Sequence, residues 1–127
     1  MREFKFRAWN KQEKRMIGHD ELERDYNLPY LLKRPVSESF SLTEYTGAKD
    51  VNGKEIYRND IVTTDQEILH VSKYWQVIWQ YMGYWLDNES DEWKDMESEY
   101  GDYINWQALT VVGNTYENPE LLRGDAQ

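Results

Sequence analysis

The segment Glu44–Val62, with the sequence EYTGAKDVNGKEIYRNDIV, constrains the fold of this chain more than any other stretch. Its turn-forming residues recur at short intervals and separate runs that are too short for helices. The pair Asn52 and Gly53 is the strongest hairpin signal, because both residues tolerate the positive φ angles of a type I′ turn. The pair Asn59 and Asp60 marks a second turn, where we expect the aspartate to accept bonds from backbone N–H groups. These features predict an all-β fold.

The N-terminal part of the chain adds a hairpin and a loop. Phe4–Trp9 alternates apolar and charged residues, which predicts a half-buried strand. We expect it to pair with Met16–Ile17 as an N-terminal β-hairpin. The segment 19–37 contains Pro29 and Pro35, which interrupt any long helix, so it is predicted to be an irregular loop with short helical turns.

Further short strands are predicted along the rest of the chain. Their ranges are Phe40–Tyr45, Lys54–Tyr57, Ile61–Val62, Glu67–Val71, Trp75–Trp79, Tyr84–Leu86, Ile104–Trp106 and Leu109–Val112. This density of short strands favours a small SH3-like or related barrel over a layered α/β fold. We expect residues 1–45 to form a hairpin-and-loop subdomain and residues 46–127 a barrel domain, with one compact domain as the alternative.

Particular turn residues support this interpretation. Near the end of the chain, Asn118 is expected to cap a short helix that starts at Pro119. The full set of predicted structural turn positions is Gly47, Asn52, Gly53, Asn59, Asp60, Gly113, Asn118 and Pro119.

Four stretches together resemble the YopX family of phage and prophage proteins. They are MREFKFRAWNKQEKRMI at 1–17, the segment 44–62, the strand around Val77 to Trp79, and VVGNTYENPELL at 111–122. The resemblance implies a compact, mostly β protein of phage or prophage origin in the bacterial cytoplasm, and it carries over no catalytic residue. Family members usually place glycine where this chain has Asn59. Asparagine is the next-best residue for left-handed backbone, so we expect this turn to survive.

Charge is distributed unevenly along the chain, whose net charge is −9. Residues 1–59 carry 12 basic and 10 acidic side chains, whereas residues 60–127 carry 3 basic and 14 acidic ones. Eight of these acids lie in the segment 87–102, which is predicted to be either an amphipathic helix or a solvated excursion. Its acids are interpreted as a solvated face, with mimicry of nucleic-acid phosphates or cation binding as alternatives. The strongly acidic half of the chain, residues 60–127, is expected to repel nucleic acid and to favour basic partners.

Several kinds of chemistry find no support in the sequence. The chain has no cysteine, and its two histidines, His19 and His70, are 51 positions apart without a metal-ligand pattern around them. No nucleophile motif is present. We therefore expect no cofactor, no metal site and no enzymatic activity. No apolar run is long enough for a membrane span, and the first residues lack the apolar core of a signal peptide, so we expect a cytoplasmic protein.

Basic and aromatic residues suggest where a partner would bind. Ten Tyr and Trp residues lie between Tyr74 and Trp106; they are interpreted as core and interface residues, with stacking on nucleic acid or sugars as alternatives. The bases of the N-terminal strand could contact phosphates, or the acidic half of a neighbouring subunit in a head-to-tail oligomer. The predicted interface residues are Arg2, Lys5, Arg7, Trp75, Trp85, Asp91, Glu92, Asp95 and Glu97.

Together these observations predict a phage or prophage accessory protein that binds or oligomerises rather than catalyses. Its expected partner is itself, as a homo-oligomer, together with a host or phage protein. Two alternatives remain. The N-terminal bases could hold nucleic acid, or the acidic stretch could occupy a basic host protein.

Overall fold

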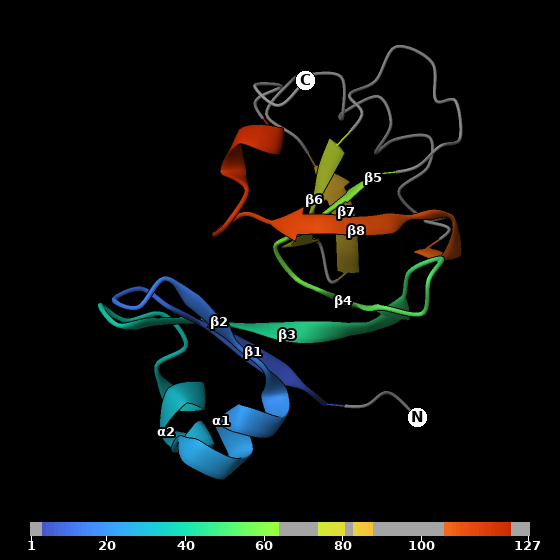
Figure 1. The fold of residues 1–127 in the computed structure, drawn as a ribbon. Helices are drawn as coiled ribbons and strands as arrows, with labels where there is room; N and C mark the ends of the chain where they lie inside the picture. The colour runs from blue at the N-terminus through green and yellow to red at the C-terminus, as the bar shows by residue number, and fades with distance from the viewer. Residues whose placement is uncertain (1–3, 64–73, 81–82, 88–105, 123–127) are drawn as a thin grey trace.

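The computed structural model describes residues 4–63, 74–80, 83–87 and 106–122. Their strands form two antiparallel four-stranded sheets, in the orders β2-β1-β3-β4 and β7-β6-β5-β8 (Figure 1). The strands are β1 (Phe6–Asn10), β2 (Arg15–Ile17), β3 (Phe40–Lys49), β4 (Glu55–Tyr57), β5 (Asp60–Thr63), β6 (Tyr74–Gln80), β7 (Gly83–Asp87) and β8 (Thr110–Asn114). The predicted mainly β fold is confirmed. No helix among the described residues has the length and apolar character to cross a membrane.

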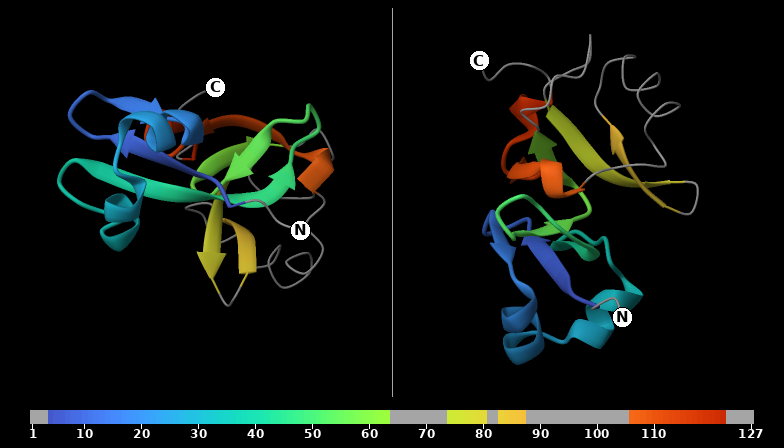
Figure 2. Two further views of the ribbon diagram at one scale, coloured as in Figure 1. Left: turned by 90° about the horizontal axis from the view of Figure 1, so that it is seen from below. Right: turned by 90° about the vertical axis from the view of Figure 1, so that its right-hand side faces the viewer.

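The first sheet is covered on both faces. Two short helices lie against one face and the second sheet lies over the other, so the molecule has three layers (Figure 2). Residues that alternate along a strand point to opposite faces, and Ala8 and Leu42 pack with the buried helix residues Leu22 and Leu31. On β1, Trp9 and Asn10 are also buried. The predicted hairpin of β1 and β2 is confirmed, but β1 is buried on both sides rather than half-buried.

The segment predicted to be an irregular loop contains two helices, α1 (His19–Asp25) and α2 (Leu28–Lys33). The side chain of Asn27 accepts a hydrogen bond from the Tyr30 N–H (3.2 Å) and caps α2, whose first turn contains Pro29. A proline in the first turn is compatible with a helix because its missing N–H would have no partner there. Pro29 therefore lies in the first turn of a short helix, and no long helix forms between residues 19 and 37, as predicted.

The turn at Asn52 and Gly53 differs from the predicted type I′ turn. Gly53 has a φ of +81°, whereas Asn52 is not among the residues with positive φ. The Gly53 N–H donates to the Asp50 carbonyl (3.0 Å), and the Asp50 N–H donates to the Lys54 carbonyl (2.8 Å). This is the pattern of a four-residue turn followed by a glycine bulge, which needs left-handed backbone only at the glycine.

The second predicted turn forms as expected. Asn59 has a φ of +73°, and the Asp60 carboxylate accepts a hydrogen bond from the Tyr57 N–H (2.8 Å). Gly47 has a φ of +94° but lies inside β3, where the register with β4 shifts between Tyr45 and Lys49. Gly47 therefore forms a bulge within a strand, not a turn between strands.

The C-terminal residues depart from the prediction in detail. Asn118 precedes the short 3₁₀ helix η3 (Pro119–Leu121), but its side chain does not cap that helix. Instead its Oδ1 accepts a hydrogen bond from the Asn114 N–H (3.3 Å). Gly113 lies in β8, and a Cβ there would stand 2.3 Å from this oxygen, so the glycine provides room for a close approach.

A second hydrophobic core lies between β4 of the first sheet and the second sheet. It consists of the buried residues Ile56, Val62, Trp75, Val77, Leu86 and Leu109. A hydrogen bond from the Val51 N–H to the Leu109 carbonyl (2.9 Å) joins the turn after β3 to this sheet. Trp106, predicted to end a strand, begins the 3₁₀ helix η2 (Trp106–Ala108). The predicted strand Glu67–Val71 and residues 88–102 of the acidic stretch lie outside the described residues, and the division into two domains stays a prediction.

Candidate functional site

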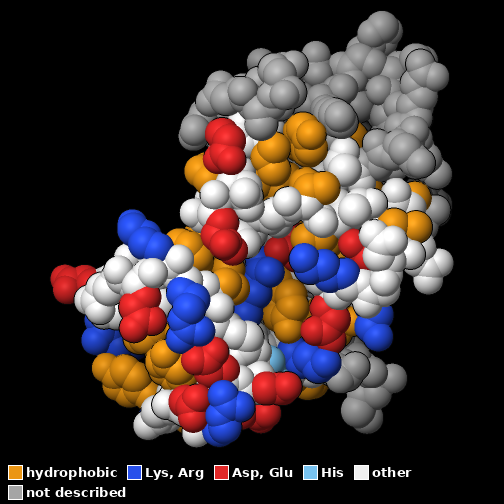
Figure 3. Space-filling model, in the orientation of Figure 1, with side chains coloured by type: hydrophobic (Ala, Val, Ile, Leu, Met, Phe, Trp, Pro, Cys, Tyr) orange, Lys and Arg blue, Asp and Glu red, His pale blue; other side chains and the backbone are white. Residues whose placement is uncertain are grey.

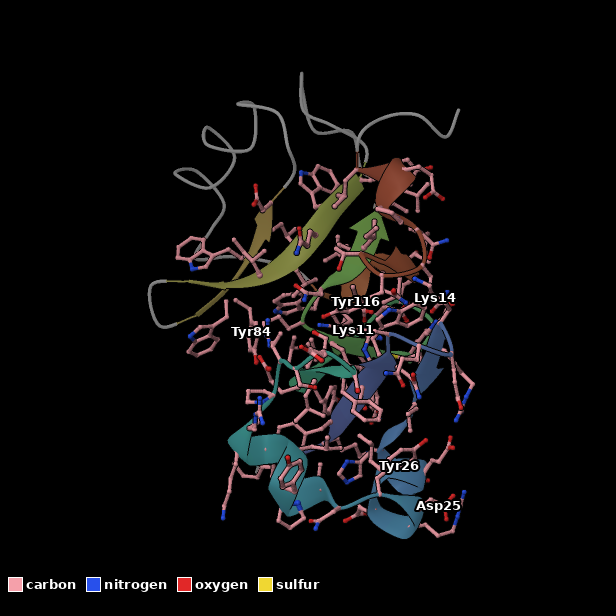
Figure 4. The ribbon with its side chains drawn as sticks, turned by 90° about the vertical axis from the view of Figure 1, so that its left-hand side faces the viewer. Lys11, Lys14, Asp25, Tyr26, Tyr84 and Tyr116 are labelled. Carbon is pink, nitrogen blue, oxygen red and sulfur yellow. The ribbon has the colours of Figure 1, made fainter. Side chains whose placement is uncertain are left out.

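A polar and aromatic layer separates the two sheets; we call it the seam. It contains side chains from the face of β1 and β3 that points away from the helices, and side chains that meet them from β4, β5 and the segment after β8. The rings of Trp9 on β1 and Tyr116 after β8 stack across it (5.7 Å between centroids), whereas the rings of Tyr45 and Tyr57 (5.7 Å) are paired on neighbouring strands of the first sheet. Figure 4 shows Tyr116 at this level of the molecule. The seam thus joins the sheets through rings and polar groups, beside the aliphatic contact that Ile56 of β4 makes with the second core.

A buried ion pair crosses the seam. The Arg7 Nη2 lies 2.5 Å from the Asp60 Oδ1, and the exposed fractions of the two side chains are 12% and 1%. The guanidinium also stands over the Tyr57 ring, 4.7 Å from its centroid. Burial raises the pKa of the Asp60 carboxyl above its ordinary value, although Arg7 and the Tyr57 N–H act in the opposite direction. The pair therefore holds the sheets together, and breaking it would leave a charge without a partner.

Asn59 is the centre of a hydrogen-bond network in the seam. Its Nδ2 donates to the Tyr116 hydroxyl (3.0 Å), and its Oδ1 accepts from the Gln76 Nε2 (2.9 Å). The same hydroxyl shares a hydrogen bond with the Ser41 Oγ (2.9 Å). Asparagine therefore does more than tolerate the left-handed turn, because a glycine at this position could make neither side-chain bond.

Four of the basic N-terminal residues make contacts within the chain. Figure 3 shows acidic and basic side chains interspersed over the face that it draws, with no single basic patch. The contacts join Lys5 to Glu55 (2.6 Å), Arg7 to Asp60 (2.5 Å), Lys11 to the Ser37 carbonyl (2.6 Å) and Arg15 to Glu21 (3.0 Å). Arg7 in particular is a seam residue and not the surface residue that the sequence predicted. Arg2 lies outside the described residues.

Of the other predicted interface residues, the two tryptophans lie within the fold and the four acids lie outside the described residues. Trp75 is 2% exposed and belongs to the second core, so it is a core residue and not an interface residue. Trp85 lies on β7 and is half-buried. The predicted acidic contacts, namely Asp91, Glu92, Asp95 and Glu97, lie outside the described residues.

An open groove of about 490 Å³ lies at the edge of the seam; we call it the Trp79 groove. Trp79 follows Trp75 and Val77 on one face of β6 but lies beyond the end of the core, and it is 49% exposed. Its partner on β7 is Tyr84, whose ring meets it edge-on at 4.8 Å between centroids. The residues that line the groove are Glu44, Arg58, Asn59, Ile78, Trp79 and Tyr84.

The rim of the Trp79 groove is held in place by a charged pair. The Arg58 Nε lies 3.0 Å from each carboxylate oxygen of Glu44, and the Tyr84 hydroxyl donates to the same carboxylate (2.9 Å). A carboxylate that accepts three such bonds is a fixed polar surface rather than a free base. Sequence reasoning singled out neither Glu44 nor Arg58, because residues that come together through tertiary folding have no local spacing that identifies them.

His19 has a structural role. Its Nδ1 accepts a hydrogen bond from the Phe6 N–H (3.0 Å), and its Nε2 lies 3.4 Å from a carboxylate oxygen of Glu23. The ring thus ties the start of α1 to the first strand. No cluster of three or more metal-ligating side chains occurs in the part of the chain that the structure describes. His70 lies outside that part.

Comparisons with known proteins agree with this fold. The crystal structure of protein EF1440 from Enterococcus faecalis is similar, with a TM-score of 0.59 and 21% sequence identity over 96% of this chain and 99% of that chain. At this identity the likeness concerns the fold alone. No curated protein matches the sequence. Residues 5–123 match the family described as YopX protein. Since this match covers almost the whole length, the chain belongs to the YopX protein family.

Proposed function

We propose that this protein is a non-catalytic binding protein that associates with further copies of itself, as an accessory protein of a phage or prophage. The observation that carries the proposal is the Trp79 groove. Trp, Tyr and Arg are the residue types that most often dominate the energy of protein interfaces, and Trp79, Tyr84 and Arg58 line this groove together. A half-exposed tryptophan beside ordered polar groups is a suitable centre for such an interface.

Binding is favoured over catalysis by the way in which the charged groups are used. Glu44 and Arg58 are bonded to each other at the rim, and Arg7 and Asp60 are paired inside the seam. A catalytic acid or base needs to reach a substrate proton, whereas these groups are bonded to one another.

A protein partner is favoured over nucleic acid. Four of the N-terminal bases make contacts within the chain, so they offer few charges to phosphates, and the net charge of −9 opposes such binding. We expect no binding to a fluorescent oligonucleotide in an anisotropy titration at low salt, where electrostatic attraction is strongest. Tight, salt-sensitive binding there would favour the nucleic-acid alternative.

Sedimentation velocity tests the proposal. The wild-type chain is expected to sediment as a species larger than its 15.4 kDa monomer over the micromolar range. Trp79→Ala should shift it towards the monomer, because it removes the exposed ring. Val51→Ala is the matched control, since Val51 is also apolar and exposed (57%) but does not line the groove. A wild-type protein that remains monomeric at every concentration would refute the proposal.

A further inference from the structure

We infer that the Asn52–Gly53 peptide is a site of spontaneous deamidation, that hydrogen bonds to Asp50 restrain the reaction in the folded chain, and that the isoaspartate product releases the turn from β8. Asparagine is a chemically labile residue, and a following glycine has no Cβ to shield the backbone nitrogen that attacks it. Asn52 is the only asparagine of the chain that a glycine follows. This reactivity does not depend on the proposed self-association.

The reaction takes place between two neighbouring groups. The Gly53 backbone nitrogen gives up its proton to a base in the solvent and attacks the side-chain carbonyl carbon of Asn52. The leaving amide nitrogen takes up a proton from water and departs as ammonia, which leaves a five-membered succinimide ring. Water then opens the ring at either of its two carbonyl groups and gives aspartate or isoaspartate. The net change consumes one water molecule and replaces an amide by a carboxylate.

Both reacting groups are accessible to solvent. Asn52 and Gly53 are exposed, and a Cβ built on Gly53 would have no atom within 4 Å beyond its chain neighbours. The Asn52 carboxamide makes no hydrogen bond with any residue in the described part of the chain. A base and a water molecule can therefore reach the peptide, and no side-chain contact holds the amide away from the Gly53 nitrogen.

The folded turn restrains the reaction through its backbone. The Gly53 N–H, which must lose its proton, donates to the Asp50 carbonyl (3.0 Å). The N–H groups on either side, those of Asn52 and Lys54, donate to the Asp50 Oδ1 (2.9 Å each). Attack requires the Gly53 nitrogen to turn towards the Asn52 side chain, which breaks its bond to Asp50. The reaction therefore proceeds from a locally opened turn, and the Asp50 contacts keep the population of that state low.

Isoaspartate at this position would loosen the contact between the turn and β8. It carries the main chain through the former side chain and adds one methylene group before Gly53. The Gly53 N–H can then no longer close a four-residue turn on Asp50. The same turn lies beside the start of β8 (Figure 1), where the Asp50 Oδ2 accepts a hydrogen bond from the Val111 N–H (2.9 Å). Its Val51 N–H donates to the Leu109 carbonyl (2.9 Å), so the modification should weaken both attachments.

Peptide mapping by mass spectrometry during incubation at mildly alkaline pH tests the restraint. The readout is the rate at which the amide of Asn52 is replaced by a carboxylate. Wild type unfolded in urea should react at least about tenfold faster than folded wild type. Folded Asp50→Ala should react about tenfold faster than wild type, because it loses two of the bonds that keep the turn closed. Asp50→Asn keeps one acceptor oxygen, so its rate should lie between these two, and it provides the same test where the alanine variant does not fold.

Two controls separate local opening of the turn from unfolding of the whole chain. Arg7→Met breaks the buried ion pair of the seam but leaves the Asp50 contacts in place, so its rate should stay within about threefold of the wild type. Asn27 is exposed but followed by leucine, so in urea it should react at least about tenfold more slowly than Asn52. Equal rates in folded and unfolded wild type, or in Arg7→Met and Asp50→Ala, would overturn the restraint by the turn. An Asn52 that reacts no faster than Asn27 in urea would overturn the site itself.

Urea unfolding of the modified protein tests the consequence. Protein that contains isoaspartate at position 52, isolated by ion-exchange chromatography, should unfold at a lower urea concentration than fresh wild type. Asn52→Asp is the matched control, because it adds the same charge to an unaltered main chain and should unfold close to the wild-type concentration. An isoaspartate form as stable as the wild type would overturn the release of the turn. Equal destabilisation of Asn52→Asp would assign the effect to charge and overturn the argument from the longer main chain.

Discussion

Replacing Asp50 with alanine should destabilise the protein more than any change at the neighbouring residues Asn52 and Gly53 that drew attention to this turn. Asp50 is 4% exposed. Its Oδ1 accepts hydrogen bonds from the Asn52 and Lys54 N–H groups, and its Oδ2 accepts one from the Val111 N–H, each at 2.9 Å. One carboxylate thus closes the turn and fastens it to β8.

The magnitude follows from these three bonds. A hydrogen bond to a charged group contributes about 1.5–3 kcal/mol, but water can replace the carboxylate at exposed Asn52 and Lys54. We therefore expect Asp50→Ala to lower the free energy of unfolding by about 2–4 kcal/mol, a large part of the 5–15 kcal/mol typical of a domain. Asp50→Asn keeps one acceptor oxygen. When that oxygen faces the turn, the amide NH₂ group faces the Val111 N–H, so two donors oppose each other. The free energy of unfolding of this variant should therefore lie between those of the alanine variant and the wild type.

The effect should depend on pH with a definite sign. Burial alone would raise the pKa of Asp50, but the hydrogen bonds from the Val111, Lys54 and Asn52 N–H groups together outweigh it and lower the pKa. A lowered pKa in the folded state contributes stability that is present above the unfolded-state value of about 3.9. That contribution is lost as the pH falls through the folded-state pKa. The difference between wild type and Asp50→Ala should therefore shrink in acid.

Urea unfolding followed by circular dichroism at pH 7 and near pH 3 measures this difference. Asn52→Ala is the control, because Asn52 is exposed, does not need left-handed backbone, and donates its backbone N–H with any side chain. It should change stability by less than about 0.5 kcal/mol. An Asp50→Ala protein as stable as the wild type at pH 7, or a loss that is equal at both pH values, would refute the reasoning.

Three further substitutions test the seam and β8 by urea unfolding. Asn59→Gly should cost about 1 kcal/mol, because two lost side-chain hydrogen bonds outweigh the relief of left-handed backbone; a more stable variant would contradict the network. Arg7→Met should cost about 3–5 kcal/mol at pH 7 and less in acid, where buried Asp60 takes up a proton; a neutral result would contradict the pair. Gly113→Ala should destabilise by more than 1 kcal/mol, since its Cβ would stand 2.3 Å from a side-chain oxygen; wild-type stability would exclude that crowding.

Local signals account for the parts of the fold that the sequence predicted. The strands have period-two alternation, and Asn59 and Asp60 form the expected turn because its chemistry lies within four residues. Short helical turns are predicted between residues 19 and 37, but the extent of the two helices is not, because each is only a turn or two long and is stabilised by burying Leu22 and Leu31 against the first sheet. That contribution depends on tertiary packing and has no periodic pattern of useful length.

The candidate site was predictable only in part. Trp79 was among the aromatic residues noted in the sequence, but alternation along β6 could not tell which ring lies in the core and which at its end, so buried Trp75 was chosen instead. Arg7 looked like a surface base because its partner Asp60 is 53 residues away in the chain. Interactions of that separation are set by how the two sheets stack, and single-sequence reasoning has no access to them.

Pairing, rather than composition, decides which charges remain available to a partner. The N-terminal bases appear in the sequence as one patch, yet several of them neutralise acids of the same chain. Surface electrostatics should therefore be judged from what is left after internal pairing, because a charge already bonded to its own chain contributes little at a distance. On that basis exposed Lys14, whose ammonium makes no hydrogen bond or ion pair with any described residue, is more available to a partner than Arg7, although both have the same formal charge. The place to look for function moves from the face of the first strand to the Trp79 groove.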